Sequence, residues 1–485
     1  MKIKKIARLM AFLLALCLMI SCFGGCNENK TSSDPVSSDN SLLYGNASDY
    51  DDDVTDGDSL ITNNSSNGTG TGAGDGNGTT VGKPNTNIEI DEEGKKDFLS
   101  SVPKKFKGTT VRVLVWWEPG TAEVAKAQAF ENATGIKIKW IKTGGNDAYY
   151  TKLSALIGQD NAPDLACVKQ NNFPSCIIQN YFEPITVGKL DLSDKVYDVE
   201  TMNQFKWNGK HYGALLKNST MVTFYSCVFN KDLYSKAGIK NPYKMWQAGN
   251  WNWDTFVSSS LELKNKLGLE YPVTATYSGY YFVNSAATDI IKFDDGKIIN
   301  NAKDQKLVDA WTQLRSMVFD YKIMATSGSQ SQFFERKAAL LMDGNYIMQN
   351  GDVLAKNCKF DWGYAPIPSP KGQNLVIPSQ VKMWGFPRGS KNAEAAGYWL
   401  RYWQDPSFDT AGKELWVNDD VANFNNWLWE QPKQFENYIG IINYGGNYSF
   451  QTLTSEMMSS SANVKTVLDK WYDTINGNIS KMTGK

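Results

Sequence analysis

The chain has 485 residues, 50 basic and 51 acidic side chains, and a single histidine, His211. Its length exceeds what one hydrophobic core usually holds and predicts two large lobes. The charge balance leaves no basic excess, so no nucleic-acid partner is expected. One histidine excludes His-based catalytic triads and His-rich metal sites.

The first 25 residues have the features of a signal peptide. Residues 1–8 are basic and residues 9–20 are apolar, a run too short for a comfortable membrane span. The small pair Gly24-Gly25 directly before Cys26 resembles a bacterial lipobox, in which the cysteine receives a lipid anchor. Cys22 is the alternative anchor, and an ordinary cleaved signal is less favoured. We therefore expect a lipid-anchored protein on the extracellular face of a bacterial cell membrane.

Residues 26–105 are expected to form a disordered tether. The segment is rich in Asn, Ser, Gly, Thr and Asp, and its few apolar side chains cannot bury enough surface to offset the entropy of ordering. Its acidic run at residues 51–58 does not have the spacing of an EF-hand, because Val54 occupies a ligand position. The sequence thus predicts a folded body held away from the membrane, with no metal site.

A β-α-β-α-β pattern opens the folded body. Strands are predicted at 111–115, 136–140 and 165–168, alternating with a helix at 122–133 that Gly135 ends and a helix that Asn146 caps and Gly158 ends. This order is typical of a parallel sheet covered by helices on both faces. In such sheets, ligands bind beyond the carboxyl ends of the strands.

The residues at those strand ends suit a polyhydroxyl ligand. Trp117 and Glu118 follow the first strand, and Gln170 and Asn171 follow the third. An aromatic ring can stack on the apolar face of a sugar, while carboxylate and amide groups bond to its hydroxyls. The sequence therefore predicts a carbohydrate site at this sheet edge.

The rest of the chain is less regular. We predict a hairpin at 205–212 on the turn Asn208-Gly209, strands at 221–230, 338–342 and 381–386, and helices at 232–237, 303–321 and 393–403. Asn252 is expected to cap a further helix. Pattern alone does not say how these elements pair with the first sheet.

Several motifs in this order resemble one family. They are Phe130-Glu131-x-x-Thr134-Gly135-Ile136, Ala162-Pro163-Asp164-Leu165, Asn208-Gly209-Lys210-x-Tyr212-Gly213, Phe229-Asn230-Lys231-Asp232-Leu233, Trp251-x-Trp253-Asp254-x-Phe256 and Lys337-Ala338-Ala339-Leu340-x-Met342-Asp343-Gly344, with Arg336 in place of the usual Gly. Their order across residues 111–403 resembles the extracellular solute-binding proteins of carbohydrate ABC importers, of the maltose-binding-like type (family 1).

The resemblance implies an α/β fold of the two-lobe periplasmic-binding-protein-like type (type II), with three hinge crossings and an interlobe ligand cleft. The expected division is a lipoprotein signal peptide at 1–25, the tether at 26–105, a first lobe of 106–216 plus 343–387, and a second lobe of 217–342 plus 388–485. The implied mechanism is ligand capture by hinge closure.

The candidate ligand contacts combine the strand ends with the positions that the resemblance indicates. They are Trp117, Glu118, Gln170, Asn171, Asn218, Tyr277, Tyr280, Tyr281, Asn345, Tyr346 and Trp384. Asn218 follows the first expected crossing, Asn345 and Tyr346 follow the second, and Trp384 lies on the third. The tyrosines at 277–281 lie where relatives carry a stacking aromatic ring. Packing in the protein core is the alternative for these tyrosines and for both tryptophans.

These features lead to one functional prediction and two alternatives. We expect a monomeric substrate-binding lipoprotein, without enzymatic activity, cofactor or metal, that binds a sugar or oligosaccharide and delivers it to ABC permease subunits. A secreted glycoside hydrolase is one alternative, because it needs only two carboxylates, for which Glu118 and Asp164 are the candidates. A surface carbohydrate-binding adhesin without a transport role is the other. Cys167 and Cys176 either form a disulfide or remain free buried thiols.

Overall fold

The computed structural model describes residues 91–144, 148–349, 351, 353–408, 416–436, 439–442, 444 and 450–484. All of them belong to one compact unit, Leu43–Lys485. The expected signal peptide, both candidate anchor cysteines, the expected tether up to residue 90 and the helix cap Asn146 lie outside the described residues.

The first lobe is built on parallel strands in the predicted order. β1 (Thr110–Val115) pairs in parallel with β2 (Lys137–Lys142), and α3 (Thr121–Thr134) connects them. A parallel bridge from Val113 to Leu165 brings β3 (Ala166–Lys169) to the other side of β1, after α4 (Ala148–Leu156). Gly135 ends α3 with φ 76°, in the left-handed region that glycine adopts without strain. The carboxyl ends of β1 and β3 therefore lie at one edge.

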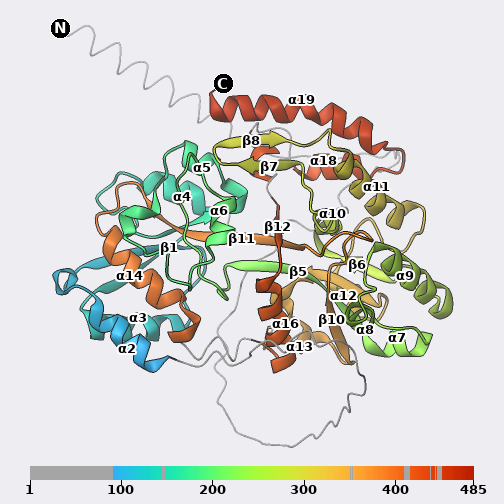
Figure 1. The fold of residues 1–485 in the computed structure, drawn as a ribbon, viewed down its shortest axis with the longest axis horizontal. Helices are drawn as coiled ribbons and strands as arrows, with labels where there is room; N and C mark the ends of the chain where they lie inside the picture. The colour runs from blue at the N-terminus through green and yellow to red at the C-terminus, as the bar shows by residue number, and fades with distance from the viewer. Residues whose placement is uncertain are drawn as a thin grey trace, which may run out of the picture. The chain divides into compact units, whose positions relative to one another are not determined.

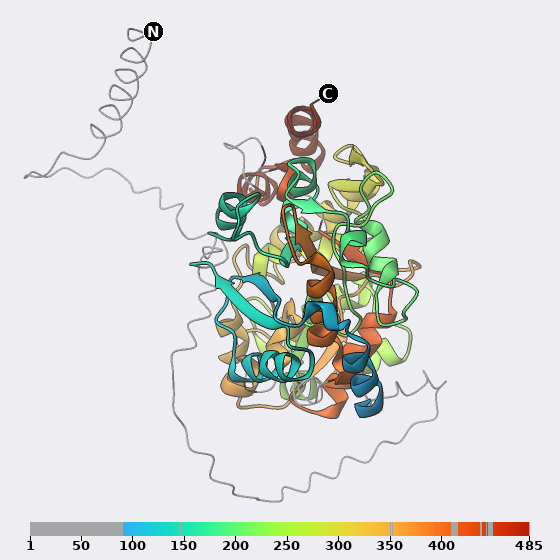
Figure 2. The same ribbon diagram turned by 90° about the vertical axis from the view of Figure 1, so that its left-hand side faces the viewer.

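Short helices and one short strand complete this lobe. They are α2 (Glu92–Ser101), η1 (Lys104–Phe106), η2 (Gln170–Asn172), α5 (Ser175–Ile178), β4 (Phe182–Glu183), η3 (Ile185–Gly188), α6 (Val199–Gln204), α14 (Ala393–Gln404) and η6 (Pro406–Phe408). Helix α2 lies beside α3 (Figure 2). Its side chains Phe98 and Leu99 pack against the hydrophobic core. The folded body therefore includes α2, which lies before the expected tether boundary at residue 105.

Helix α14 packs on the first lobe, although the motif order assigns residues 388–485 to the second. It contacts α3, β1 and η3. Its apolar face buries Trp399 and Tyr402, whose ring centroids lie 5.3 and 5.1 Å from that of Phe130 on α3. The packing of this helix face decides its location, and helical periodicity does not indicate which lobe a helix covers.

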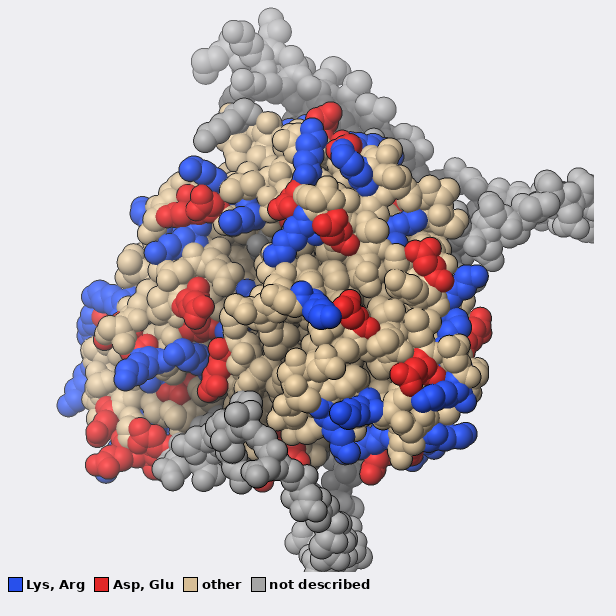
Figure 3. Space-filling model, turned by 45° about the vertical axis from the view of Figure 1, so that its right-hand side comes forward, with Lys and Arg blue, Asp and Glu red and all other residues tan. Residues whose placement is uncertain are grey.

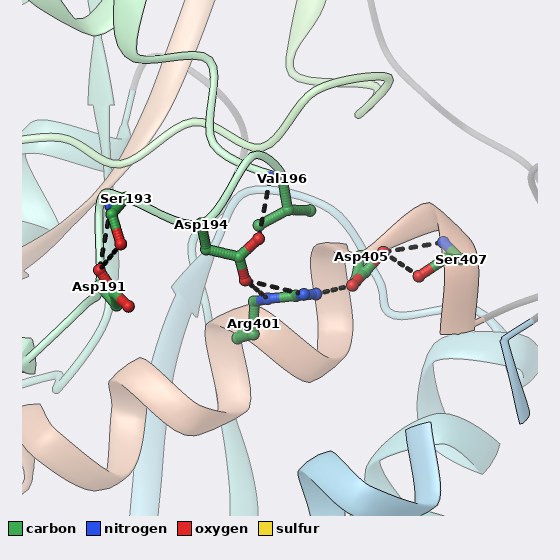
Figure 4. A network of polar contacts seen from close by, with 7 residues as sticks. All are labelled: Asp191, Ser193, Asp194, Val196, Arg401, Asp405 and Ser407. Atoms are coloured by element: carbon green, nitrogen blue, oxygen red, sulfur yellow. Dashed lines mark hydrogen bonds and ion pairs between the residues drawn. The ribbon is translucent and has the colours of Figure 1, made fainter. Parts of the chain in front are cut away.

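Arg401 fixes the far end of α14 (Figure 4). Its Nη2 donates to Asp194 at 3.1 Å, and its guanidinium forms an ion pair with Asp405. Asp405 is 2 % exposed and also accepts hydrogen bonds from the Ser407 amide and hydroxyl, at 2.8 and 2.7 Å. One arginine thus joins α14 to the loop between η3 and α6 and to η6.

The second lobe contains a mixed sheet with β5 at its centre. Its strands are β5 (Val222–Asn230), β6 (Val273–Ala275), β9 (Leu340–Gly344), β10 (Trp362–Pro366), β11 (Ile377–Pro387) and β12 (Lys433–Phe435). The strands follow the order β12–β11–β5–β9–β6. Strand β5 is antiparallel to both β11 and β9, whereas β9 and β6 are parallel. Strand β10 also pairs with β5, in antiparallel orientation. The carboxyl ends of β6 and β9 therefore lie together.

Helices cover both faces of this sheet. They are α7 (Lys231–Ala237), α8 (Pro242–Gln247), α9 (Trp253–Leu267), η4 (Thr276–Gly279), α10 (Tyr280–Asn284), α11 (Gln305–Phe319), α12 (Gln330–Phe334), η5 (Asn345–Met348), α13 (Val353–Asn357), α16 (Asp419–Glu430), α17 (Ile439–Ile442), α18 (Phe450–Met457) and α19 (Val464–Thr483), with the hairpin β7 (Ile291–Asp294) and β8 (Lys297–Asn300). Alternate β5 residues enter different cores: Tyr225 and Cys227 pack with α10 and α11, and Phe224 and Val228 pack with α16 and the first lobe.

Strands β5 and β11 join the two lobes (Figure 1). The carboxyl half of β11 pairs with β3, with Trp384 opposite Cys167. Its amino half pairs with β5, where residues 379–381 lie opposite residues 222–224. We call this second set of pairs the interlobe ladder. Because one strand is shared by both sheets, the ladder is the place where the lobes meet.

The molecular surface carries both signs of charge. Basic and acidic side chains lie interspersed over the face seen in Figure 3, as the near-zero net charge suggests. Within the described part of the chain, no helix combines the length and the apolar character that crossing a membrane requires.

Candidate functional site

Side chains from both lobes bond to the interlobe ladder. Gln170 directly follows β3, and its Oε1 accepts a hydrogen bond from the Val381 amide at 2.7 Å. Asn345 directly follows β9, and its Oδ1 accepts one from the Phe224 amide at 3.1 Å. The carboxyl ends of β3 and β9 therefore converge on the same short ladder. A ligand held between the lobes would meet both sheets there.

Aromatic rings gather at the carboxyl end of β1. The rings of Trp116 and Trp117 have centroids 4.6 Å apart, and both residues are partly exposed. The Trp117 ring lies 6.3 Å from Trp384 and 6.4 Å from Trp403. Its Nε1 donates to Glu123 at 3.0 Å. The Trp116 and Trp117 rings therefore form a partly exposed aromatic surface at this strand end, and the buried rings of Trp384 and Trp403 pack against Trp117.

Glu118 and Trp384 have contrasting environments at this end of the first lobe. Glu118 is exposed and forms an ion pair with Lys142. Trp384 is 1 % exposed, on β11, and its ring packs 4.7 Å from Trp403. The carboxylate is thus open to solvent, whereas the Trp384 ring supports the aromatic cluster from inside.

Two lysines lie over the Trp116 ring. Lys169 and Lys382 are opposite each other in the β3–β11 pair, and their Nζ atoms lie 4.3 and 5.0 Å from the ring centroid. Burial raises the pKa of the neighbouring Cys167 thiol to about 11, while the two lysines act in the opposite direction. The ammonium groups of two lysines therefore lie beside the Trp116 ring at the carboxyl end of β3.

A buried carboxylate organises the strand ends of the second lobe. Asp343 is fully buried, and its oxygens accept hydrogen bonds from Thr276 and Tyr346, both at 3.0 Å, and from Gln330 at 2.8 Å. Burial raises the pKa of the Asp343 carboxyl, and these hydrogen bonds with that of the Gly344 amide oppose the rise. Since Thr276 follows β6 and Tyr346 follows β9, Asp343 connects the two parallel strand ends and fixes the half-buried Tyr346 ring.

A second buried carboxylate lies beside the ladder. Gln380, opposite Thr223, donates from Nε2 to Oε2 of Glu436 at 2.8 Å, and Gln170 donates to the Glu436 carbonyl oxygen. Glu436 is 4 % exposed. Burial raises its pKa to about 8, against the hydrogen bond from Gln380 and with the help of the Asp289 charge. The two glutamines thus connect the first lobe, the ladder and the segment after β12.

The remaining predicted contacts occupy different places. Asn171 in η2 and Asn218 in the turn before β5 are exposed. Tyr280 is 1 % exposed and donates to Asp289 at 2.6 Å. Tyr281 is fully buried, with its ring stacked 4.3 Å from Tyr225. Tyr277 belongs to η4, and its side chain is outside what the structure describes. The tyrosines at 280 and 281 therefore belong to the core of the second lobe in this conformation.

The carboxylate pair considered for a glycoside hydrolase is engaged in other contacts. Asp164 is fully buried, and its oxygens accept hydrogen bonds from the Arg112 and Asn392 amides and from the Ser390 hydroxyl, at 2.9 to 3.0 Å. Asp164 thus holds the segment before α14 against β1, which is a structural arrangement.

Cys167 and Cys176, for which the sequence leaves a disulfide open, are free and buried. Burial raises the pKa of Cys176 to about 12, so its thiol stays protonated. Among the described residues, no group of three or more His, Cys, Asp and Glu side chains is arranged to hold a metal ion.

Sequence reasoning missed Asp343, Gln380 and Glu436 as organisers of the site. Asp343 belongs to a quoted motif, and its place between a predicted strand and Asn345 is a usable signal. Gln380 directly precedes a predicted strand. Nothing local distinguishes Glu436, because its partner Gln170 is 266 positions away in the chain.

Residues 116–408 match the family model for a bacterial extracellular solute-binding protein. A binding protein of Brucella abortus is 25 % identical over 295 residues, which cover 57 % of this chain and 66 % of the relative. The alignment thus spans a little less than two thirds of that relative's length.

Solved structures share the fold. The cyclic α-maltosyl-1,6-maltose binding protein of Arthrobacter globiformis superposes with a TM-score of 0.61 at 14 % identity, over 77 % of this chain and 99 % of its own. An extracellular solute-binding protein of Staphylococcus aureus, solved in complex with maltose, has a TM-score of 0.60 at 15 % identity, over 78 % and 99 %. The predicted two-lobe α/β fold of type II is confirmed.

Proposed function

The chain belongs to the bacterial extracellular solute-binding proteins, and from that premise we propose that it binds a sugar or an oligosaccharide between its lobes. The observation that carries the proposal is the convergence of strand ends from both lobes on the interlobe ladder, through Gln170 and Asn345. Aromatic and amide side chains at those ends match the apolar faces and hydroxyl edges of sugar rings. Relatives of this fold that are described as binding maltose and a cyclic maltosyl-maltose support a saccharide ligand.

The exposure of the candidate residues separates two roles. We assign direct ligand contact to the partly or fully exposed ones, above all Trp117, Asn171 and Tyr346, with Glu118 and Asn218 at the margin. Buried Gln170, Asn345, Trp384, Tyr280 and Tyr281 hold these residues or the ladder in place. Tyr277 is also a proposed contact, because it directly follows Thr276 at the end of β6.

The proposed mechanism is closure about the interlobe ladder. A ligand bound to one set of strand ends would bring the other lobe onto it, because only the closed arrangement lets both sets of side chains bond to the same molecule. The closed, loaded protein would then deliver its ligand to ABC permease subunits. An extracellular or periplasmic location follows from the family, and we propose a monomer that Cys26 anchors by a lipid.

Replacing Tyr346 with alanine should weaken saccharide binding at least tenfold. The half-buried ring lies at the end of β9, and truncation of a well-placed aromatic anchor often costs about 2 kcal/mol, more than tenfold in affinity. A thermal-shift panel of mono- and oligosaccharides would first identify a ligand, since ligands of the folded state raise the melting temperature. Calorimetric titration would then measure the loss.

Tyr321→Ala is the matched control, because this tyrosine is 40 % exposed and follows α11 in the segment that pairs, at Met324, with the amino end of β6. Equal affinity in the two variants would reject Tyr346 as a contact. Failure of every saccharide to shift the melting temperature would reject carbohydrate binding. Release of reducing ends during titration would instead indicate a hydrolase.

Cys26→Ser should release the protein from membranes or leave it unprocessed, because no thiol would then stand at the favoured lipid site. Metabolic labelling with a fatty acid and membrane fractionation would measure the change, with Cys22→Ser as the control. Unchanged labelling of the Cys26 variant would transfer the anchor to Cys22.

A further inference from the structure

Two elements of the second lobe contact the first lobe beside the proposed ligand site. Helix α17 contacts η2, the turn that carries Asn171. The β7–β8 hairpin contacts the residue after η2, because the Phe293 ring lies 5.1 Å from the Phe173 ring. In the turn of this hairpin, Asp295 accepts a hydrogen bond from the Gly209 amide at 2.8 Å. The second lobe therefore holds the first lobe at η2 and at the turn that contains Gly209.

Helix α19 supports both of these elements. The Asn478 side chain is buried, and its Nδ2 donates to the Ile441 and Ile442 carbonyl oxygens of α17, both at 3.1 Å. Helix α19 also lies beside β8 (Figure 1), where Asn300 donates from its Nδ2 to the Tyr472 carbonyl oxygen at 2.9 Å. Because one long helix fixes both elements, α17 and the hairpin are positioned together against the first lobe.

Gly440 allows α17 to lie directly on η2. A Cβ atom added at this position would be 2.5 Å from the Asn171 carbonyl oxygen, which belongs to the backbone and cannot rotate away as a side chain can. A larger residue would therefore push α17 and η2 apart. The contact covers the Asn171 backbone, whereas Asn171 as a whole remains exposed. This proposed ligand contact is thus held in place and still accessible.

We propose that α17, α19 and the β7–β8 hairpin, which we call the interlobe clamp, hold η2 in the closed arrangement of the lobes, and that Gly440 is a positioning residue for this closure. The inference rests on the proposed function and identifies the part of the second lobe that retains the saccharide. Because the clamp touches the backbone of a proposed ligand contact, its contacts favour the ligand-bound arrangement. Helices α17 and α19 follow residue 408, where the match to the family model ends.

Gly440→Ala should weaken saccharide binding roughly tenfold, because overpacking the contact raises the free energy of the closed arrangement. Maltotriose, cellotriose and xylotriose would be titrated into the full chain by calorimetry, and the one that binds most tightly would be used for the variants. Stopped-flow tryptophan fluorescence should show a faster dissociation rate and an unchanged association rate, since the clamp retains a saccharide that is already bound. A purely structural role for Gly440 would lower the melting temperature and leave the dissociation rate unchanged.

Gly477→Ala is the matched control. Gly477 lies within α19, and a Cβ atom added there would meet no other atom within 4 Å, so the same change should leave binding unchanged. Asp295→Ala tests the hairpin separately, at an exposed position. It should weaken binding roughly two- to tenfold, the usual net effect of one hydrogen bond. Asp295→Asn, which keeps an oxygen acceptor, should restore binding.

Hydrogen exchange without added saccharide tests the clamp contact independently of binding. The amides of residues 168–176 should exchange faster in Gly440→Ala than in the wild type, because the cover over η2 is weakened. The Gly477→Ala protein should exchange like the wild type in this segment.

The outcomes separate this inference from the proposed function. Unchanged or tighter saccharide binding by Gly440→Ala overturns the inference and leaves saccharide binding intact. Unchanged hydrogen exchange of residues 168–176 overturns the contact between α17 and η2 as a restraint on the first lobe. If the wild type binds none of the saccharides, the proposed function is overturned, and the role of the clamp in retaining a ligand with it.

Discussion

Replacing Glu436 with glutamine should make the protein more stable at pH 8, by at most about 4 kcal/mol. The Glu436 carboxyl is 4 % exposed, and burial raises its pKa from the ordinary value near 4.5 to about 8. An amide is neutral at every pH and can still accept the hydrogen bond from Gln380. The substitution therefore removes the cost of ionising a buried group and keeps its contact with the ladder.

The sign of the pH effect follows from proton binding. Between pH 4.5 and 8, the folded protein holds a proton on Glu436 that the unfolded chain has lost, so stability falls as the pH rises. The contribution of Glu436 is fully present below about pH 4.5 and is lost by about pH 8. Urea denaturation at several pH values should show a downward slope in this window for the wild type and a smaller slope for Glu436→Gln.

Glu430→Gln provides the matched control for this experiment. Glu430 is exposed at the end of α16, six positions before Glu436, and the same chemical change there should alter stability by no more than about 0.5 kcal/mol. If Glu436→Gln and the wild type show the same dependence of unfolding free energy on pH, the buried carboxyl does not titrate in the folded state as described.

Arg401→Ala should destabilise the first lobe by about 3 to 5 kcal/mol, the usual effect of removing one partner of a buried ion pair. Asp405 is 2 % exposed and would be left with an uncompensated charge. The guanidinium carbon also lies 5.0 Å from the Phe408 ring and 5.8 Å from the Phe98 ring, so packing between α14, η6 and α2 is lost as well. The midpoint of urea denaturation should move to lower urea.

Two further variants show whether charge burial explains the effect. Lys391→Ala removes an ion pair with Asp160 whose side chains are 61 % and 100 % exposed, and it should change stability by no more than about 0.5 kcal/mol. Adding Asp405→Asn to Arg401→Ala should recover part of the loss, because the unpaired charge is gone. An Arg401→Ala protein as stable as Lys391→Ala would show that the network in Figure 4 contributes little.

The two buried carboxylates near the site have different hydrogen-bond environments. Asp343 accepts hydrogen bonds from Thr276, Gln330 and Tyr346, and these favour its charged form against burial. Burial is the largest effect at both carboxyls and raises both pKa values. Among the described side chains, Gln380 alone donates a hydrogen bond to Glu436, whose pKa rises to about 8. Asp343 is thus suited to hold Tyr346 in one orientation, whereas Glu436 makes the region around the ladder sensitive to pH.

Short-range features of the sequence determined the local structure of the first lobe. Alternating valines at 111–115 formed β1, and Gly135 ended α3 in the left-handed conformation expected of it. These outcomes depend on backbone preferences and on side-chain spacing within a few residues, so they can be derived without knowing the rest of the fold. The same holds for the placement of Trp117 two residues after β1 and of Gln170 directly after β3, and hence for their position at one edge of the sheet.

Only the tertiary structure decided which of these residues face solvent and which support them. Tyr280 and Tyr281 lie in the core because α10 turns them onto α11 and β5, and helix α14 joined the first lobe through Trp399 and Arg401. The contact between Gln170 and Glu436 spans 266 positions. Such contacts form when strands from distant segments pair with each other. Residue spacing along the chain does not predict this pairing, because the free energy that favours it comes from burying the surfaces of both segments together.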